Sequence, residues 1–322
     1  MKAIVYTEYG SVDVLQLKEI AKPIPKDNEV LIRIEATTVT AVDSTFRQGA
    51  SLSGRFYTGL KRPKRPVLGS TLAGEVEAVG KDVTLFKKGD QVFGATADFG
   101  THAEYISLPE DGALALKPAS ITYEEAVATN AVLTALPFLR DTGQIQSGQK
   151  VLINGASGNV GSYAVQLAKQ AGATVTGVCS TEKMEFVKSL GADKVIDYKK
   201  EAFTNNGETY DIIFDVVGKS SYGRCKQILK ENGVYLSTVL SPSIVLNMLW
   251  TSVVGSKKAK IAFTGLRPAS EQAKDLRFLT GLIDAGQLKS LVDRSYPLAQ
   301  TAEAYRYFET GLKKGSVVIT VA

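Results

Sequence analysis

A glycine-rich turn between an apolar run and a helical pattern constrains the fold of this chain most strongly. The stretch VLINGASGNVGSYAVQLAKQAGA (residues 151–173) opens with the apolar run and then places glycines at positions 155, 158 and 161. The residues that follow are apolar at the spacing of a helix. A strand, a tight glycine turn and a helix in this order are typical of a dinucleotide-binding βαβ unit, in which the pyrophosphate lies at the helix N-terminus.

Each glycine of this turn has an expected role. The first permits the tight turn, the second lets the backbone approach the pyrophosphate, and the third allows the helix to pack closely on the strand. A pattern of this kind is weak by itself, so the alternative is a glycine turn that binds no ligand. We expect the cofactor to contact Gly155, Ser157, Gly158, Asn159, Val160 and Gly161.

The end of the next expected strand indicates which nucleotide is bound. An NAD-binding protein places Asp or Glu there to bond the adenosine ribose. This strand ends instead in Ser180 and Thr181, with Lys183 just beyond and Tyr198 after the following strand. Hydroxyl groups accommodate a 2′-phosphate and a lysine neutralises it, so we predict NADP(H) as the cofactor. The negative charge of Glu182 disagrees with this prediction, unless its side chain points to solvent. Lys183, taken alone, is equally consistent with a solvated surface lysine.

The alternation of strands and helices changes along the chain and predicts two domains. The first third contains short alternating runs separated by Gly, Pro and Asp turns, which are typical of a mainly antiparallel barrel. From about Tyr123, apolar strands alternate with helices, which predicts a doubly wound parallel sheet. After about Phe263 the pattern is helix, strand, helix, strand. We therefore expect a first domain at 1–122, completed by 267–322, and an inserted nucleotide-binding domain at 123–266. The strands expected in it are 151–156, 174–179, 194–197, 211–216 and 233–237, with helices at 159–171 and 182–190.

Composition narrows the class of protein. The chain has 322 residues, of which 44% are hydrophobic, and a net charge of +5, which is too small for a nucleic-acid-binding composition. Its two cysteines, Cys179 and Cys225, exclude a disulfide framework and favour a reducing compartment. The apolar segment 243–255 is too short to span a bilayer, so we expect a buried or interfacial helix there. With no signal peptide in the first residues, we expect a cytoplasmic protein.

Seven blocks occur in a specific order along the chain: VLGSTLAGEVEAVG (67–80), FKKGDQVFG (86–94), GTHAEYISLP (101–109), LTA (133–135), the glycine stretch, LGADKVIDYK (190–199) and FDVVG (214–218). In this order they resemble the medium-chain dehydrogenase/reductase superfamily, in its zinc-free quinone oxidoreductase (zeta-crystallin-like) branch, over essentially the whole chain. The resemblance implies a GroES-like β-barrel catalytic domain with a Rossmann domain inserted in it and an active-site cleft between them. It also implies a homodimer joined through the edge strand of the nucleotide sheet near 259–263.

Zinc ligands are missing at the positions where related alcohol dehydrogenases hold a catalytic zinc. These positions match Thr40, Ser70 and Asn130, which offer neither thiolate nor imidazole, and His102 is the only histidine. We therefore predict a metal-free protein. Without a zinc Lewis acid, the feasible hydride acceptors are those that delocalise charge themselves, namely quinones and the C=C bond of α,β-unsaturated carbonyl compounds (enals and enones).

The resemblance implies four candidate catalytic residues: Thr40, Asp43, Tyr57 and Asn130. They would bond the substrate oxygen or the nicotinamide carboxamide. Relatives often carry a tyrosine shortly after the acidic residue, where this chain has Thr45, so we assign Tyr57 of the following loop in its place. The alternative is a hydrogen-bonded network that merely lines the cleft, since none of these side chains is an obligatory acid or base.

Further cofactor contacts are implied by the resemblance, with plain packing of strand ends as the alternative to each. They are Thr134, Val217, Gly218, Leu240, Ser241, Phe263 and Lys314. The competing function is a non-catalytic NADPH-binding sensor or interaction protein of the same fold. Some zeta-crystallin relatives bind RNA, but the basic clusters 61–66 and 257–260 lack interleaved aromatic residues, so we interpret them as solvated loops rather than a nucleic-acid site.

Overall fold

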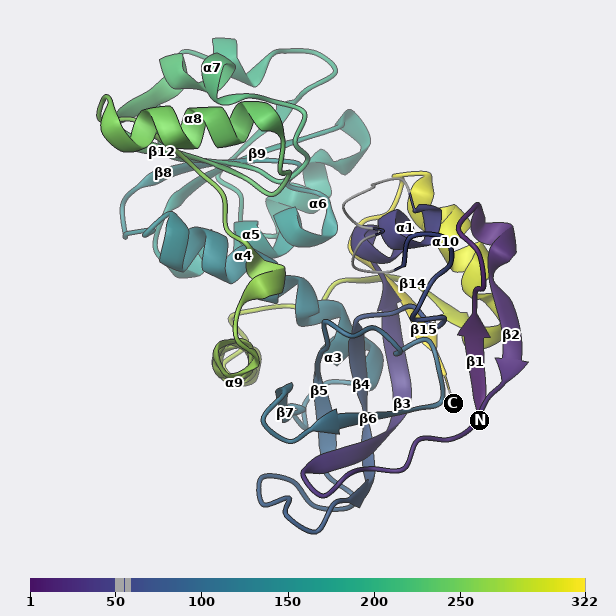
Figure 1. Ribbon diagram of the computed structural model, residues 1–322. Helices are drawn as coiled ribbons and strands as arrows, with labels where there is room; N and C mark the ends of the chain where they lie inside the picture. The colour runs from purple at the N-terminus through teal and green to yellow at the C-terminus, as the bar shows by residue number, and fades with distance from the viewer. Residues whose placement is uncertain (50–54, 56–58, 322) are drawn as a thin grey trace. The chain divides into compact units, whose positions relative to one another are not determined.

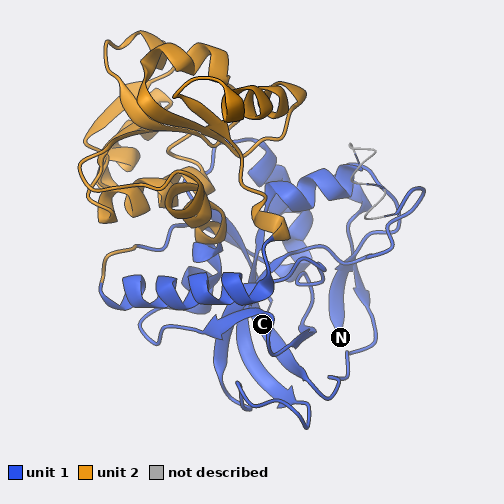
Figure 2. Cartoon of the chain, turned by 60° about the vertical axis from the view of Figure 1, so that its left-hand side comes forward, with its two compact units in different colours: residues 1–130, 267–285, 289–322 blue, residues 131–266, 286–288 orange. Residues whose placement is uncertain are grey.

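The computed structural model of the chain describes residues 1–49, 55 and 59–321, which form two compact units (Figure 1; Figure 2). Unit 1 contains residues 1–130, 267–285 and 289–322, and unit 2 contains residues 131–266 and 286–288. Unit 1 is therefore built from both ends of the chain.

Six parallel strands form the sheet of unit 2, in the spatial order β10-β9-β8-β11-β12-β13. This order is that of a doubly wound dinucleotide-binding sheet, and its direction of winding reverses between β8 and β11. The predicted parallel sheet is confirmed. The strands are β8 (Lys150–Asn154), β9 (Thr174–Cys179), β10 (Lys194–Asp197), β11 (Tyr210–Asp215), β12 (Leu229–Ser237) and β13 (Lys258–Lys260).

Helices lie on both faces of this sheet, with α7 and α8 above it and α4 and α5 below it in Figure 1. Strands covered on both faces are apolar throughout rather than alternating. In β8, the central strand of this kind, Val151, Leu152 and Ile153 are completely buried. The helices are α4 (Val132–Leu136), which continues into the π-helical turn η3 (Pro137–Thr142), α5 (Asn159–Gln170), α6 (Met184–Ser189), α7 (Tyr222–Cys225) and α8 (Pro242–Val253).

Unit 1 contains a seven-stranded sheet in the order β14-β15-β3-β4-β5-β7, with β6 also paired to β3. Its pairings are antiparallel except that of β14 with β15. Two further strands, β1 and β2, form a separate antiparallel pair. The strands are β1 (Lys2–Val5), β2 (Gln16–Glu19), β3 (Glu29–Val39), β4 (Thr71–Val79), β5 (Gln91–Ala95), β6 (Tyr105–Pro109), β7 (Ala113–Leu116), β14 (Val292–Pro297) and β15 (Ser316–Thr320).

The helices of unit 1 carry their own start signals. Thr40 and Thr122 each form a capping box with an acidic residue three positions later, which satisfies backbone amides at the helix start. The expected order of helix, strand, helix, strand after residue 263 is confirmed. The helices are α1 (Ala41–Gln48), α3 (Tyr123–Ala128), α9 (Ala269–Asp284) and α10 (Thr301–Glu309).

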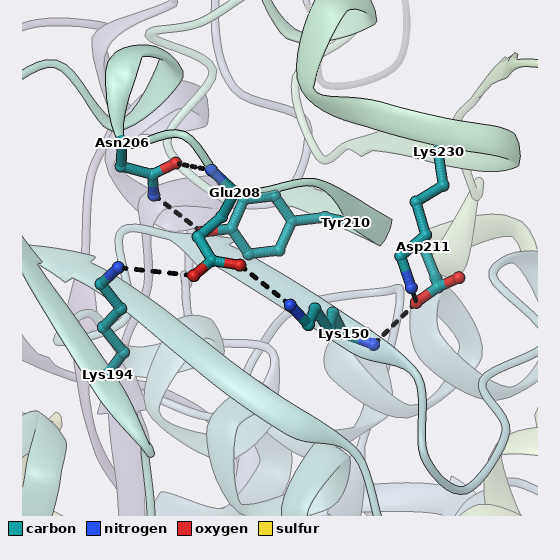
Figure 3. Close-up of polar contacts among 7 residues, drawn as sticks. All are labelled: Lys150, Lys194, Asn206, Glu208, Tyr210, Asp211 and Lys230. Atoms are coloured by element: carbon teal, nitrogen blue, oxygen red, sulfur yellow. Dashed lines mark hydrogen bonds and ion pairs between the residues drawn. The ribbon is translucent and has the colours of Figure 1, made fainter.

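A polar network ties strands of unit 2 together at their amino-terminal ends (Figure 3). Glu208 lies 2.9 Å from the ammonium of Lys150 and 4.0 Å from that of Lys194. The carboxylate of Asp211 accepts hydrogen bonds from the backbone of Lys150 at 2.8 Å and from the side chain of Lys230 at 2.7 Å. Because the strands are parallel, this network occupies the edge of the sheet opposite their carboxyl ends.

Several expected elements have different bounds in the structure. The edge strand expected at 259–263 is shorter, since β13 ends at Lys260. The helix expected at 182–190 begins as the 3-10 turn η4 (Thr181–Lys183) before α6. Within the described ranges, no helix is both long enough and apolar enough to cross a membrane. The apolar segment near residue 250 forms α8, which buries only Ile244 and Thr251.

Candidate functional site

Packing within unit 2 requires two of the three glycines of the turn after β8. Gly155 has φ +87°, in the left-handed region, and a Cβ added there would lie 2.2 Å from a methyl carbon of Val217. A Cβ on Gly161 would lie 2.1 Å from the carbonyl oxygen of Gly155, where the helix approaches the turn. These two glycines therefore have the turn and packing roles predicted for them.

The packing of the protein does not require the middle glycine. Gly158 is the N-cap residue of α5, with φ −79°, and an added Cβ would meet only the carbonyl oxygen of Gly155, at 3.4 Å, among the described atoms. Glycine also offers no side chain to cap the first-turn amides of this 12-residue helix. An open glycine surface at a helix N-terminus is suited to an anion such as a pyrophosphate, because the amides and the helix dipole both favour negative charge.

The other predicted cofactor contacts of unit 2 follow the carboxyl ends of successive strands. Since parallel strands end at one edge of a sheet, the structure brings these residues to the same edge as the glycine turn. The contact between Val217 and Gly155 lies at the reversal of the strand order, where ligands of such sheets bind. In order, Ser180 follows β9, Tyr198 follows β10, Val217 and Gly218 follow β11, and Leu240 and Ser241 follow β12.

Three predicted contacts lie elsewhere. Phe263 does not belong to a strand but follows β13 and precedes the short 3-10 turn η7 (Thr264–Leu266), and it is exposed. Thr134 lies within α4 and is half-buried. Lys314 belongs to unit 1, where it is exposed just before β15.

A salt bridge accounts for Glu182, the residue that fitted an NADPH site least. Its carboxylate lies 2.7 Å from the ammonium of Lys199, which follows the neighbouring strand β10. The pKa of Glu182 is lowered to about 2, mainly by the hydrogen bond from Lys199 and to a lesser extent by one from Ser180. The negative charge of Glu182 is therefore held against a lysine.

The hydroxyl of Thr181 is engaged within the protein, which the sequence did not predict. It donates a hydrogen bond of 2.5 Å to Asp197, the last residue of β10, whose other oxygen accepts from the backbone of Lys199 at 2.9 Å. The side chain of Tyr198 is exposed. Three lysines (Lys183, Lys199 and Lys200) follow β9 and β10 here, among the carboxylates Glu182, Glu185, Asp197 and Glu201.

In unit 1, Asp43 is completely buried at the start of α1. One carboxylate oxygen accepts from the backbone of Thr40 at 2.9 Å and from its hydroxyl at 2.6 Å, and the other accepts from the backbone of Gly69 at 3.2 Å. Burial raises the pKa of Asp43 to about 6, against these hydrogen bonds, which lower it. Asp43 therefore joins the loop of Thr40 to that of Gly69, and the structure brings the two predicted residues Thr40 and Asp43 together.

Asn130, another predicted catalytic residue, has a buried polar atom without a partner. Its amide nitrogen donates to the carbonyl oxygen of Gly94 at 2.8 Å, whereas its amide oxygen has no hydrogen-bond partner among the described residues. The third position matched to a zinc ligand, Ser70, accepts a backbone bond from Thr96 through its carbonyl oxygen at 2.8 Å.

The residues of unit 1 do not fit a zinc ion. Across the described part of the chain, no three His, Cys, Asp or Glu side chains are grouped so that they could hold a metal. His102 is buried with its Nε2 atom 3.3 Å from the carbonyl oxygen of Thr38, and burial lowers its pKa to about 4. Cys179 and Cys225 are both buried in unit 2, and burial raises the pKa of each thiol to about 11.

The remaining catalytic candidate, Tyr57, lies outside the described residues. Thr45, at the position where relatives often carry tyrosine, is exposed on α1 and donates its hydroxyl to the carbonyl oxygen of Ala41 at 2.8 Å.

Sequence reasoning missed two acidic residues near the nucleotide edge, Asp197 and Asp215. Each is the last residue of a buried strand, β10 and β11 respectively, and each is buried itself. Both could have been found as acidic residues that end an apolar strand. A carboxylate buried there requires several hydrogen-bond donors nearby.

Two family models match separate parts of the chain. The family model "Alcohol dehydrogenase GroES-like domain" matches residues 26–118, and the model "Zinc-binding dehydrogenase" matches residues 190–319. The solved "Structure of the quinone oxidoreductase from Coxiella burnetii" has a TM-score of 0.88 to this chain at 28% sequence identity, covering 100% of this chain and 99% of that one.

Two curated relatives are similar over nearly the whole chain. The 2-methylene-furan-3-one reductase of Solanum lycopersicum is 35% identical over 99% of this chain and 79% of its own length. The chloroplastic NADPH-dependent alkenal/one oxidoreductase of Arabidopsis thaliana is 34% identical over the same shares.

Proposed function

This chain belongs to the medium-chain dehydrogenase/reductase superfamily, in its quinone oxidoreductase branch, and from that premise we propose that it is an NADPH-dependent reductase of quinones or of the C=C bond of enals and enones. The family predicted from the sequence blocks is confirmed. The cofactor assignment rests on Gly158. Its open surface at the N-terminus of α5 fits a pyrophosphate, and the packing of the protein does not require a glycine at this position.

The cofactor residues proposed are those at the carboxyl edge of the unit 2 sheet. The amides at Gly158, Asn159 and Val160 hold the pyrophosphate, and Lys183 and Tyr198 receive the 2′-phosphate. The ion pair of Glu182 with Lys199 supports this, because it offsets the carboxylate that fitted a 2′-phosphate least. Bound NADPH supplies a hydride from its nicotinamide ring.

The substrate side of the reaction draws on unit 1. Asn130 offers a buried amide oxygen that has no partner among the described residues, so it binds an N–H or O–H group of a ligand. Thr40 is oriented by the Asp43 carboxylate, to which its hydroxyl already donates, so Asp43 positions Thr40 rather than contacting substrate. Ser70 occupies the third position matched to a zinc ligand, so none of the three positions offers a zinc Lewis acid its usual ligands. The hydride acceptor itself must therefore delocalise the charge that arrives with the hydride.

The test is NADPH oxidation, followed by nicotinamide absorbance, with 9,10-phenanthrenequinone, 1,4-benzoquinone and a set of enals and enones. We expect turnover with at least one acceptor class, and the preferred class identifies the subfamily. Tight NADPH binding without turnover of any acceptor would instead support a non-catalytic sensor of the same fold.

We further propose a homodimer. The apolar face of α8 supports it, because four large side chains there are more than half exposed and α8 packs beside the edge strand β13: Leu246, Leu249, Trp250 and Val253. Size-exclusion chromatography with light scattering tests the dimer.

A cytoplasmic location remains a prediction, which cell fractionation tests. The division of domains at residues 122/123 and 266/267 also remains a prediction, and expression of 123–266 alone tests it.

A further inference from the structure

Asp215 is a completely buried carboxylate at the carboxyl end of β11, beside the glycine turn. Its two oxygens accept five hydrogen bonds. Oδ1 accepts from the side-chain amide of Asn154 (2.9 Å) and from the backbone amides of Val217 (3.3 Å) and Gly218 (3.0 Å), and Oδ2 accepts from the backbone amide of Ser220 (2.9 Å) and the hydroxyl of Tyr235 (2.9 Å).

All five bonds are donated to the carboxylate oxygens. Three of the donors are backbone N–H groups, which cannot accept a proton in return. Among the described residues no lysine or arginine forms an ion pair with Asp215, so the hydrogen bonds alone offset the cost of burying its charge. Burial of its phenol raises the pKa of Tyr235, and the neighbouring Asp215 raises it further. The conformation of residues 216–220 is therefore fixed by the carboxylate that their amides surround.

The same carboxylate connects β11 to β8, the two strands between which the strand order of the sheet reverses. Asn154 is the last residue of β8, directly before Gly155, and its carbonyl oxygen accepts a hydrogen bond from the backbone of Val216 at 3.1 Å. Val217 occupies the space beside Gly155, and Gly218 has φ +69°, with Val239 Cγ2 2.5 Å from where its Cβ would be. Asp215 thus fixes the end of β8 and the loop after β11 to each other.

We propose that Asp215 is a positioning residue for NADPH, whose buried carboxylate holds the 216–220 loop against the glycine turn in the geometry that binds the cofactor. This proposal rests on the proposed function. Asp215 does not touch the cofactor, because it is buried beneath the loop, and its effect passes through Asn154 and the loop amides.

The substitution Asp215→Asn tests the proposal because it preserves shape. The amide nitrogen of asparagine must face one of the two donor sets. The Tyr235 hydroxyl and the Asn154 amide can turn to accept from it, but backbone amides cannot, so either the amide of Ser220 or those of Val217 and Gly218 then face another donor. We expect the Kd for NADPH to rise about tenfold or more and the KM for NADPH to rise with it, with kcat changing less than about twofold. Faster hydrogen exchange at the amides of residues 217–220 in the cofactor-free protein is the accompanying signature.

The matched control is Tyr235→Phe, which removes one donor to the same carboxylate but leaves the loop amides and the bond to Asn154 in place. We expect it to lower the Tm while the Kd for NADPH stays within about twofold of wild type. An Asp215→Asn variant that loses stability but binds NADPH as wild type does would overturn the proposal. If Asp215→Asn does not fold, Asn154→Ala replaces it; it cuts only the link to β8, and an unchanged Kd in that variant counts equally against the proposal.

The two levels of failure are distinguishable. Wild-type protein that does not bind NADPH refutes the proposed function and this inference with it. Wild-type protein that binds NADPH, together with variants at Asp215 and Asn154 that bind equally well, refutes the inference alone.

Discussion

Lys199 holds the carboxylate of Glu182 at 2.7 Å, although the two residues follow different strands of the sheet. Both side chains are about half exposed or more, so the pair contributes little to stability. Its consequence is the placement of charge: a carboxylate beside the predicted 2′-phosphate site is neutralised, which lets the site bind an additional phosphate.

We predict that Lys199→Ala weakens the binding of NADPH more than that of NADH, since it leaves Glu182 unpaired near the extra phosphate. The Kd for NADPH should rise severalfold at low salt, and less at high salt. Calorimetric titrations with both cofactors measure this. The control is Lys188→Ala, which removes a lysine paired to Glu185 on the same segment. Equal losses for NADPH and NADH would show that the pair does not act on the 2′-phosphate.

A second prediction separates binding from packing within the glycine turn. Gly158→Ala should leave the free energy of unfolding nearly unchanged, because its Cβ has room, but raise the Kd for NADPH by about tenfold or more through a clash with the pyrophosphate. Gly155→Ala, its matched control, should destabilise the protein by more than ~1 kcal/mol because of its positive φ and Val217. Denaturant unfolding and NADPH titration of both variants provide the check, and wild-type affinity in Gly158→Ala would contradict the assignment of the turn.

A third prediction concerns the pH dependence of stability at Asp43. Its folded pKa, about 6, lies above the unfolded value, so the native state binds more protons between about pH 4 and 6 and stability falls as pH rises through this window. The full effect is on the order of 3 kcal/mol. In Asp43→Asn this fall should disappear, so that the variant compares more favourably with wild type at pH 7 than at pH 4. Urea unfolding across the pH range measures the difference, and a difference that is independent of pH would argue against a raised pKa.

His102 should act in the opposite sense. Its folded pKa, about 4, lies below the ordinary value of 6.5, so the unfolded state binds the additional proton and stability falls as pH drops from about 6.5 to 4. His102→Asn should therefore reduce the loss of stability in acid relative to wild type, measured by thermal unfolding at each pH. A variant with the acid sensitivity of wild type would show that another group is responsible.

The nucleotide sheet could be predicted closely because its strands are continuous apolar runs bounded by turns. The strands 174–179 and 194–197 begin and end where the sequence placed them. In contrast, β2 (Gln16–Glu19) was not predicted, because all four of its residues are exposed and neither face has an apolar pattern. Similarly, the shorter extent of β13 depends on which backbone groups find a partner on β12, which the apolar pattern of 259–263 does not reveal.

The partners of the polar site residues could not be predicted. Whether the hydroxyl of Thr181 is available depends on the register of β9 and β10, which pairs Cys179 with Asp197 and so places that carboxylate beside the strand tip. The bonds of Asp215 likewise join residues from three strands and a loop. Motifs identify such residues one at a time, whereas their hydrogen bonds arise from contacts between segments distant in sequence.

The position of β15 has a consequence for how the chain is made. This strand, Ser316–Thr320, is inserted between β14 and β3 in the sheet of unit 1, so residues from the last few positions of the chain form an interior strand beside one that begins at residue 29. During synthesis the sheet of unit 1 must wait for residues 316–320, whereas all six strands of unit 2 lie earlier in the chain, between residues 150 and 260. A nascent chain interrupted before residue 316 therefore contains all six strands of the nucleotide sheet, but residues 36–39 of β3 lack their β15 partner.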